Sequence, residues 1–157
     1  MDHIDHIDLV VSSLERSLAF YGTFLQWLGY VIPGEIEGER GERVVYLNPV
    51  GGGGALGLRE AQSDTPHDRY AIGVHHIAFT APSRRAVDET ASWLRSQGAT
   101  IESEPREYGY TPGYYAVFFH DPDGIKIELV HQPKDPDLVR EVAALRERVA
   151  QLEGRAS

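Results

Sequence analysis

Residues 114–130 read YYAVFFHDPDGIKIELV and form the most strongly patterned hairpin of the chain. The turn DPDG at residues 121–124 has Pro in its second position and Gly in its fourth, which is typical of a type I turn. Apolar and aromatic residues flank it on both sides, as in two paired strands. With the turn centred between residues 122 and 123, the pattern predicts that Val117 lies opposite Glu128.

The order of elements around this hairpin occurs twice in the chain. His6 and His76 each open a short apolar strand, and a helical pattern, a further strand and a hairpin follow in both halves. We therefore predict an α+β fold in which two βαβββ modules, about residues 1–64 and 71–133, form a cupped mixed sheet. Residues 1–133 would form this domain, followed by a helical segment at 134–157.

Serines mark the start of both predicted helices. Ser12 is expected to cap the first helix, with Glu15 three residues later in a capping box. Ser83 is expected to cap the second helix. Gly29 and Gly98 follow the last apolar positions, where a glycine commonly ends a helix.

The C-terminal segment has its own pattern. Asp135 before Pro136 favours the start of a helix. Apolar residues then recur at spacings of 4 and 3, which is a heptad seam: Leu138, Val142, Leu145, Val149 and Leu152. Such a seam packs on its own domain or on a partner subunit. We predict a homodimer that uses this helix or the sheet edges.

Composition excludes several classes of function. The chain has 157 residues and a net charge of -9, which argues against sequence-independent binding to nucleic acid or to anionic lipid. It has no cysteine, so disulfides and thiolate ligands are excluded. No apolar run reaches the roughly 20 residues of a membrane span, and the N-terminus is no signal peptide. The expectation is a cytoplasmic protein without a membrane or nucleic-acid partner.

Strand parity places two histidines on the same surface. Residues 7, 9 and 11 are apolar and should pack under the first helix, which leaves His6 and Asp8 on the opposite, concave face. By the same parity, His76 and Thr80 lie on the concave face of the second module. The remaining histidines are interpreted as structural or solvated: His3, His67, His75, His120 and His131.

Glu128 joins these two histidines on the concave face. A carboxylate is costly to bury without a partner, and the predicted hairpin surrounds it with Tyr115, Val117 and Phe119. A single strand histidine is more often structural, and an isolated Glu is more often solvated. The coincidence of His6, His76 and Glu128 at repeat-related positions instead favours a metal site. Two His and one carboxylate suit Fe²⁺, Mn²⁺, Zn²⁺ or Ni²⁺ with open coordination positions.

Three stretches together resemble the vicinal oxygen chelate superfamily, also called the glyoxalase/bleomycin resistance/dioxygenase family. They are HIDLVVSSLERSLAFY at 6–21, VHHIAF at 74–79 and YAVFFHDPDGIKIEL at 115–129. The resemblance implies paired βαβββ modules around a divalent metal held by His6, His76 and Glu128. It also implies a substrate that chelates the metal through adjacent oxygens.

One departure from the family pattern limits this inference. Glyoxalase I and its near relatives carry a further ligating Glu in the last strand of the first module, where it also transfers a proton. Here that strand reads ALGLR at 55–59. The residue that corresponds to Glu128 in the repeat is Gly57 or Leu58, and neither of these binds metal. A lactoylglutathione lyase mechanism therefore lacks its base. Extradiol dioxygenases and fosfomycin-inactivating transferases use a three-ligand site.

Two hypotheses follow. The first is a metal-dependent enzyme with dioxygenase-like or lyase/isomerase-like chemistry, in which the metal acts as a Lewis acid. Tyr115 would be its proton donor or a hydrogen-bond partner, with Asp8, Arg59 and Thr80 lining the substrate pocket. The alternative is a metal-independent drug- or metabolite-binding resistance protein of the bleomycin-binding type.

Two further points stay open. The tyrosine-rich segment 108–114 is either an ordinary loop or a lid over the site. Pairing of modules between chains, rather than within one, would bring His6 and Glu128 of different subunits together.

Overall fold

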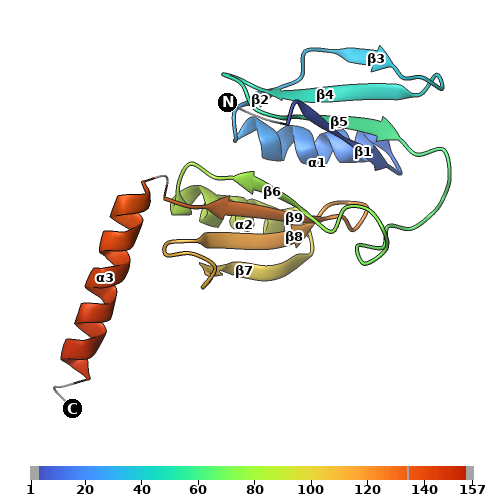
Figure 1. Ribbon diagram of the computed structural model, residues 1–157. Coiled ribbons are helices and arrows are strands. Elements are labelled where there is room, and N and C mark those ends of the chain that lie inside the picture. The colour runs from blue at the N-terminus through green and yellow to red at the C-terminus, as the bar shows by residue number, and fades with distance from the viewer. Residues whose placement is uncertain (1–3, 134, 155–157) are drawn as a thin grey trace.

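The computed structural model describes residues 4–133 and 135–154, so His3 lies outside the described residues. Figure 1 shows two modules, one above the other, and a helix that extends away from them. The first module contains β1 (His6–Val11), α1 (Leu14–Gln26), β2 (Tyr30–Val31), β3 (Glu35–Glu37), β4 (Arg43–Pro49) and β5 (Ala55–Glu60). The second contains β6 (Ile77–Thr80), α2 (Arg84–Ser96), β7 (Ile101–Glu107), β8 (Tyr115–His120) and β9 (Lys126–His131), and α3 (Pro136–Glu153) follows it.

Each module folds its own sheet. The strand orders are β1-β5-β4-β2, with β3 added on β4, and β6-β9-β8-β7. In both sheets the first strand runs parallel to the last one, and the other pairs are antiparallel. The predicted α+β fold with two βαβββ-type modules is therefore confirmed. The short strand β3 is an addition that the sequence pattern did not predict.

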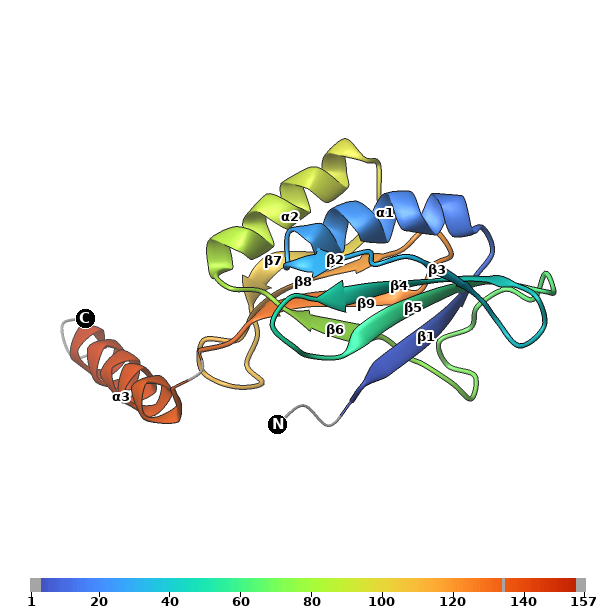
Figure 2. The same cartoon turned by 90° about the horizontal axis from the view of Figure 1, so that it is seen from above.

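Helices α1 and α2 lie side by side on the same face of the two sheets (Figure 2). Phe20 on α1 contacts Trp93 on α2, with ring centroids 5.5 Å apart. Phe24 on α1 packs edge-on against Phe119 of the second sheet at 5.4 Å. One hydrophobic cluster therefore contains residues from both modules. The opposite face of each sheet, called the open face below, carries the predicted site.

The helix caps differ in one position from the prediction. Ser83 caps α2 as predicted, and its side chain accepts a hydrogen bond from the N–H of Ala86. The cap of α1 is Ser13 rather than Ser12. The Ser12 N–H donates instead to a carboxylate oxygen of Asp123, 2.9 Å away. The first module is thus bonded to the hairpin turn of the second.

The register of the β8–β9 hairpin is shifted by one residue, so the predicted pairing of Val117 with Glu128 is wrong. His120 pairs with Lys126 and Phe118 with Glu128. The loop takes five residues because Gly124 follows the type I turn with a φ of 80°. A slip of one residue moves every side chain of a strand to the other face. This shift decides which of the adjacent residues Tyr114 and Tyr115 faces the site.

None of the helices in residues 4–133 and 135–154 is long and apolar enough to cross a membrane.

Candidate metal centre

Glu128 is buried on the open face of the second sheet. Only 3% of its surface is exposed, and Ala78 lies beside it on β6. The hydroxyl of Tyr114 donates a hydrogen bond of 2.5 Å to Oε1 of Glu128. Nε2 of His76 lies 3.4 Å from the other carboxylate oxygen, Oε2. The prediction that His76 and Glu128 share one face is confirmed.

His75 orients the imidazole of His76. The two Nδ1 atoms are 2.8 Å apart, so one ring donates a hydrogen bond to the other. Desolvation lowers the pKa of His75, and the neighbouring His76 lowers it further. Neutral His75 can accept a hydrogen bond from Nδ1–H of His76 or donate one to it, and both arrangements fit this separation. In the first arrangement, Nε2 of His76 presents its lone pair on the side of Glu128.

An aromatic cluster surrounds this pair. Phe118 lies beside Glu128 in the ladder, and its ring centroid is 6.5 Å from that of His76. Tyr108 packs edge-on against Phe118 at 5.2 Å and stacks on Tyr110 at 5.5 Å. The tyrosine-rich segment therefore lies next to the site, and its last residue, Tyr114, reaches Glu128.

Tyr115 lies on the other face of β8 because of the register shift. Its hydroxyl donates a hydrogen bond of 2.7 Å to Asp88 on α2. The prediction that Tyr115 is on the metal-binding face is therefore wrong. Tyr114, which the sequence placed at the start of the hairpin and in a segment read as a loop or a lid, has the position expected there. Its role was not predicted, because the register depends on whether Gly124 belongs to the turn. The same shift places His120 on the open face, where it contacts Glu102.

His6 lies on the open face of the first sheet, as predicted. Half of its side chain is exposed, and its Nδ1 atom is 2.7 Å from Oδ1 of Asp5. This hydrogen bond is the main cause that raises the pKa of His6. The ring of Tyr46 stands perpendicular to it at 5.6 Å. Carboxylates commonly orient metal-binding histidines through the second ring nitrogen in this way.

The predicted substrate-binding residues Asp8 and Arg59 pair with each other. Nη2 of Arg59 lies 2.6 Å from Oδ2 of Asp8, and Nη1 lies 2.9 Å from Oε1 of Glu42. Oδ1 of Asp8 and Nε of Arg59 are buried without a hydrogen-bond partner among the described residues. Thr80 is apart from this pair, on the exposed edge of β6 in a groove that β5 also lines.

The ladder decides which residue of β5 corresponds to Glu128. Asp8 lies beside Gly57 in the parallel pair β1–β5, just as Ala78 lies beside Glu128 in β6–β9. Gly57, not Leu58, is therefore the mate of Glu128. A β-carbon at Gly57 would lie 2.1 Å from Oδ1 of Asp8, so the Asp8 carboxylate occupies the space of a side chain there.

The three predicted ligands do not come together within one chain. Among the described residues, no three His, Asp or Glu side chains form a group that could hold a metal ion. His76 and Glu128 form one half of such a site. His6, with Asp5 behind it, lies in the other module.

Comparison with known proteins gives a consistent result. The family described as the Glyoxalase/Bleomycin resistance protein/Dioxygenase superfamily matches residues 3–129. The uncharacterized protein YqjT of Bacillus subtilis (strain 168) is 32% identical over 130 residues, which are 80% of this chain and 95% of that protein.

Solved structures have the same fold. A glyoxalase family protein from Enterococcus faecalis superposes with a TM-score of 0.63 at 26% identity, covering 82% of this chain and 96% of that one. The fosfomycin resistance protein FosX from Listeria monocytogenes gives a TM-score of 0.63 at 20% identity, covering 85% and 96%. At 20% identity the likeness concerns the fold alone.

Proposed function

The chain belongs to the glyoxalase/bleomycin resistance protein/dioxygenase superfamily, and we propose that it is a metal-dependent enzyme that acts on a small oxygenated substrate. His6, His76 and Glu128 would hold a divalent metal, Fe²⁺, Mn²⁺, Zn²⁺ or Ni²⁺. The observation that carries the proposal is the contact between His76 and the buried carboxylate of Glu128.

The geometry of this pair suits two ligands of one ion. Metal bonds of about 2.0–2.2 Å at a tetrahedral angle place two ligand atoms roughly 3.4 Å apart. Nε2 of His76 and Oε2 of Glu128 are separated by 3.4 Å. When Nδ1–H of His76 donates to His75, both facing atoms are acceptors, and a cation between them relieves their repulsion. This donor set and this separation support the proposed metal position.

The third ligand is proposed to come from a second copy of the chain. His6 does not join His76 and Glu128 within one chain. It is the first residue of β1, which is an edge strand of the first sheet. Strand β6 is the corresponding edge strand of the second sheet. Two copies that exchange these edges would each complete the other's site. This arrangement agrees with the predicted homodimer and with pairing of modules between chains.

The chain's own residues then have distinct roles. The metal would act as a Lewis acid that polarises a substrate oxygen at its open positions. Tyr114 orients the Glu128 carboxylate through its hydrogen bond and limits access of water to it. Asp8 and Arg59 form an ion pair beside Gly57. Gly57 is the residue of the first module that corresponds to Glu128, and it provides no carboxylate. Dioxygenase-like or lyase/isomerase-like chemistry fits this donor set better than a reaction that needs a second carboxylate as a fourth ligand.

The first test is the metal content of protein purified without chelator, measured by mass spectrometry of the elements. We expect bound divalent metal in the native chain and its loss in His76→Ala and Glu128→Ala. His67→Ala is the matched control, because His67 lies exposed in the segment between the modules. Absence of metal, together with no uptake on titration, would contradict the proposal and favour the metal-independent binding protein.

The second test asks whether two chains share one site. His6→Ala and Glu128→Ala variants are each expected to bind no metal. In a mixed assembly of the two, a shared arrangement gives one site with both defects and one intact site, so metal binding is partly restored. If each site lay within one chain, every site would carry one defect and mixing would restore nothing.

A further inference from the structure

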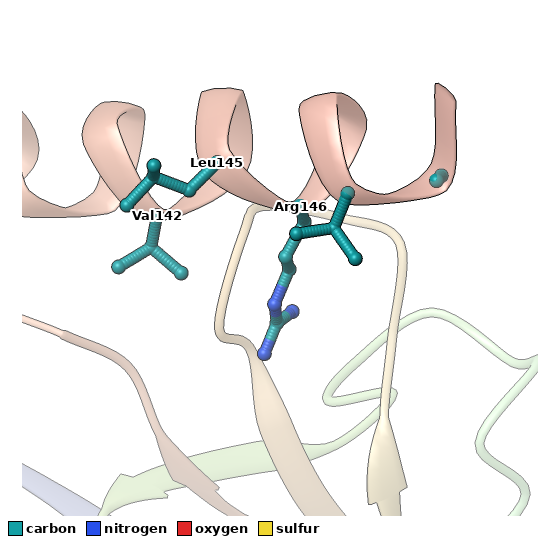
Figure 3. Close-up of a pocket in the computed structure, with 5 residues that line it drawn as sticks. Val142, Leu145 and Arg146 are labelled. Carbon is teal, nitrogen blue, oxygen red and sulfur yellow. The ribbon is translucent and has the colours of Figure 1, made fainter. Parts of the chain in front are cut away.

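Helix α3 carries an apolar stripe that its own domain leaves exposed. Leu145, Val149 and Leu152 are 55%, 52% and 60% exposed. Leu145 and Val149 line, with Val142 and Arg146, a groove along one side of the helix, which Figure 3 shows in close-up. An ion pair of 2.5 Å between Arg146 and Glu107 joins α3 to β7. An exposed continuous apolar stripe of this kind marks an interaction surface.

The spacing of the stripe indicates its partner. In heptad notation Val142 and Val149 occupy a positions, and Leu145 and Leu152 occupy d positions. Valine at a with leucine at d is the combination that favours two parallel helices, because β-branched side chains pack well in the a layer of a dimer. The seam therefore suits a second copy of itself.

Charges beside the seam agree with this pairing. Glu141 falls at a g position and Arg146 at the e position five residues later. In a parallel dimer the g residue of one helix faces that e residue of the other, so both sides of the dimer carry an opposite-charge pair. The sequence repeats the relation one heptad later with Arg148 and Glu153. Like charges at these positions would oppose the same alignment.

Pairing also accounts for a helix that stands apart from its domain. An 18-residue helix spans about 27 Å, and isolated helices of this size are only marginally stable without packing of their apolar face. We propose that α3 forms a parallel two-stranded coiled coil with α3 of a second copy, joined through the seam Val142, Leu145, Val149 and Leu152. This contact is separate from the proposed metal site, because α3 carries none of the proposed ligands.

The test measures mass in solution by light scattering on the full chain. Leu145→Glu with Val149→Glu places charge in the seam, and we expect the mass to halve. Ala144→Glu with Gln151→Glu adds the same number of carboxylates outside the seam and should leave the mass unchanged. If the sheet edges pair with a further copy, the change is from tetramer to dimer; if they do not pair, it is from dimer to monomer. An unchanged mass in the seam variant together with no covalent dimer from Leu152→Cys, or an equal loss in the control, would overturn the proposal.

Orientation is tested by cross-linking, which is simple because the chain has no cysteine. Leu152→Cys should form a covalent dimer on mild oxidation if the helices are parallel and in register. Gln151→Cys, one residue outside the seam, should not. A seam variant that lowers the mass while Leu152→Cys gives no covalent dimer would overturn the parallel arrangement. Retention of metal in the seam variant would separate this contact from the proposed active site.

Discussion

Gly57 and Asp8 lie side by side in the ladder, and a β-carbon on Gly57 would stand 2.1 Å from Oδ1 of Asp8. The Asp8 carboxylate therefore fills the space that a side chain at position 57 would need. Position 57 of the first module corresponds to position 128 of the second. The two modules therefore differ here, because the second has a carboxylate at this position and the first has none. This inequality separates the chain from relatives that use a fourth ligand there.

Gly57→Ala is expected to destabilise the protein by about 1–3 kcal/mol, the usual cost of overpacking. The added methyl group would displace Asp8 from its contact with Arg59. Gly34→Ala is the matched control, because no atom lies within 4 Å of a β-carbon there. Denaturant unfolding measures both. In an Asp8→Ala background the cost of Gly57→Ala should shrink, and an unchanged cost would show that Asp8 is not the obstacle.

Tyr114→Phe is expected to weaken metal binding by roughly 10–100-fold, the usual effect of losing a group that orients a ligand. Tyr114 donates its hydroxyl to Glu128, and Phe keeps the ring but not the hydrogen bond. Tyr115→Phe is the comparison, because its hydroxyl faces Asp88 on α2. Metal titration distinguishes the two. Equal losses would contradict the assignment of faces on β8.

Glu102→Gln is expected to lower the free energy of unfolding near neutral pH. Hydrogen bonding to Lys126, together with Arg69 and His120, lowers the pKa of Glu102 from 4.5 to about 2. A lowered folded-state pKa stabilises the fold above the unfolded-state pKa, and this contribution is lost as the pH falls from about 4.5 to about 2. The difference between native protein and variant should therefore narrow across that range. A difference that stays constant with pH would contradict the prediction.

Tyr21→Phe is expected to cost about 1–3 kcal/mol, because it removes a hydrogen bond from a buried carboxylate. Tyr21 on α1 donates to Oδ2 of Asp121 at 2.8 Å, and burial raises the pKa of Asp121 while this bond opposes the rise. Tyr110→Phe is the control, since Tyr110 is largely exposed. Thermal unfolding compares them. An equal effect in both would show that the bond between the modules adds no stability.

Several features could be predicted because they depend on local pattern. Strand parity placed His76 and Glu128 on one face, and Ser83 was identified as a cap from its position before a helical pattern. The hairpin register could not be predicted, because it depends on whether Gly124 belongs to the turn or to the strand. That single residue moved Tyr115 away from the site and brought Tyr114 to it.

The sequence by itself determined the repeated order of strands and helix, since alternation of apolar residues and turn residues are local properties. It also determined which residues of each strand share a face. Only the tertiary structure decided that Asp8 pairs with Arg59, that Gly57 is the mate of Glu128, and that His6 lies apart from His76 within one chain. These relations join residues distant in sequence, and they depend on how strands align and how the two modules pack, which no local pattern specifies.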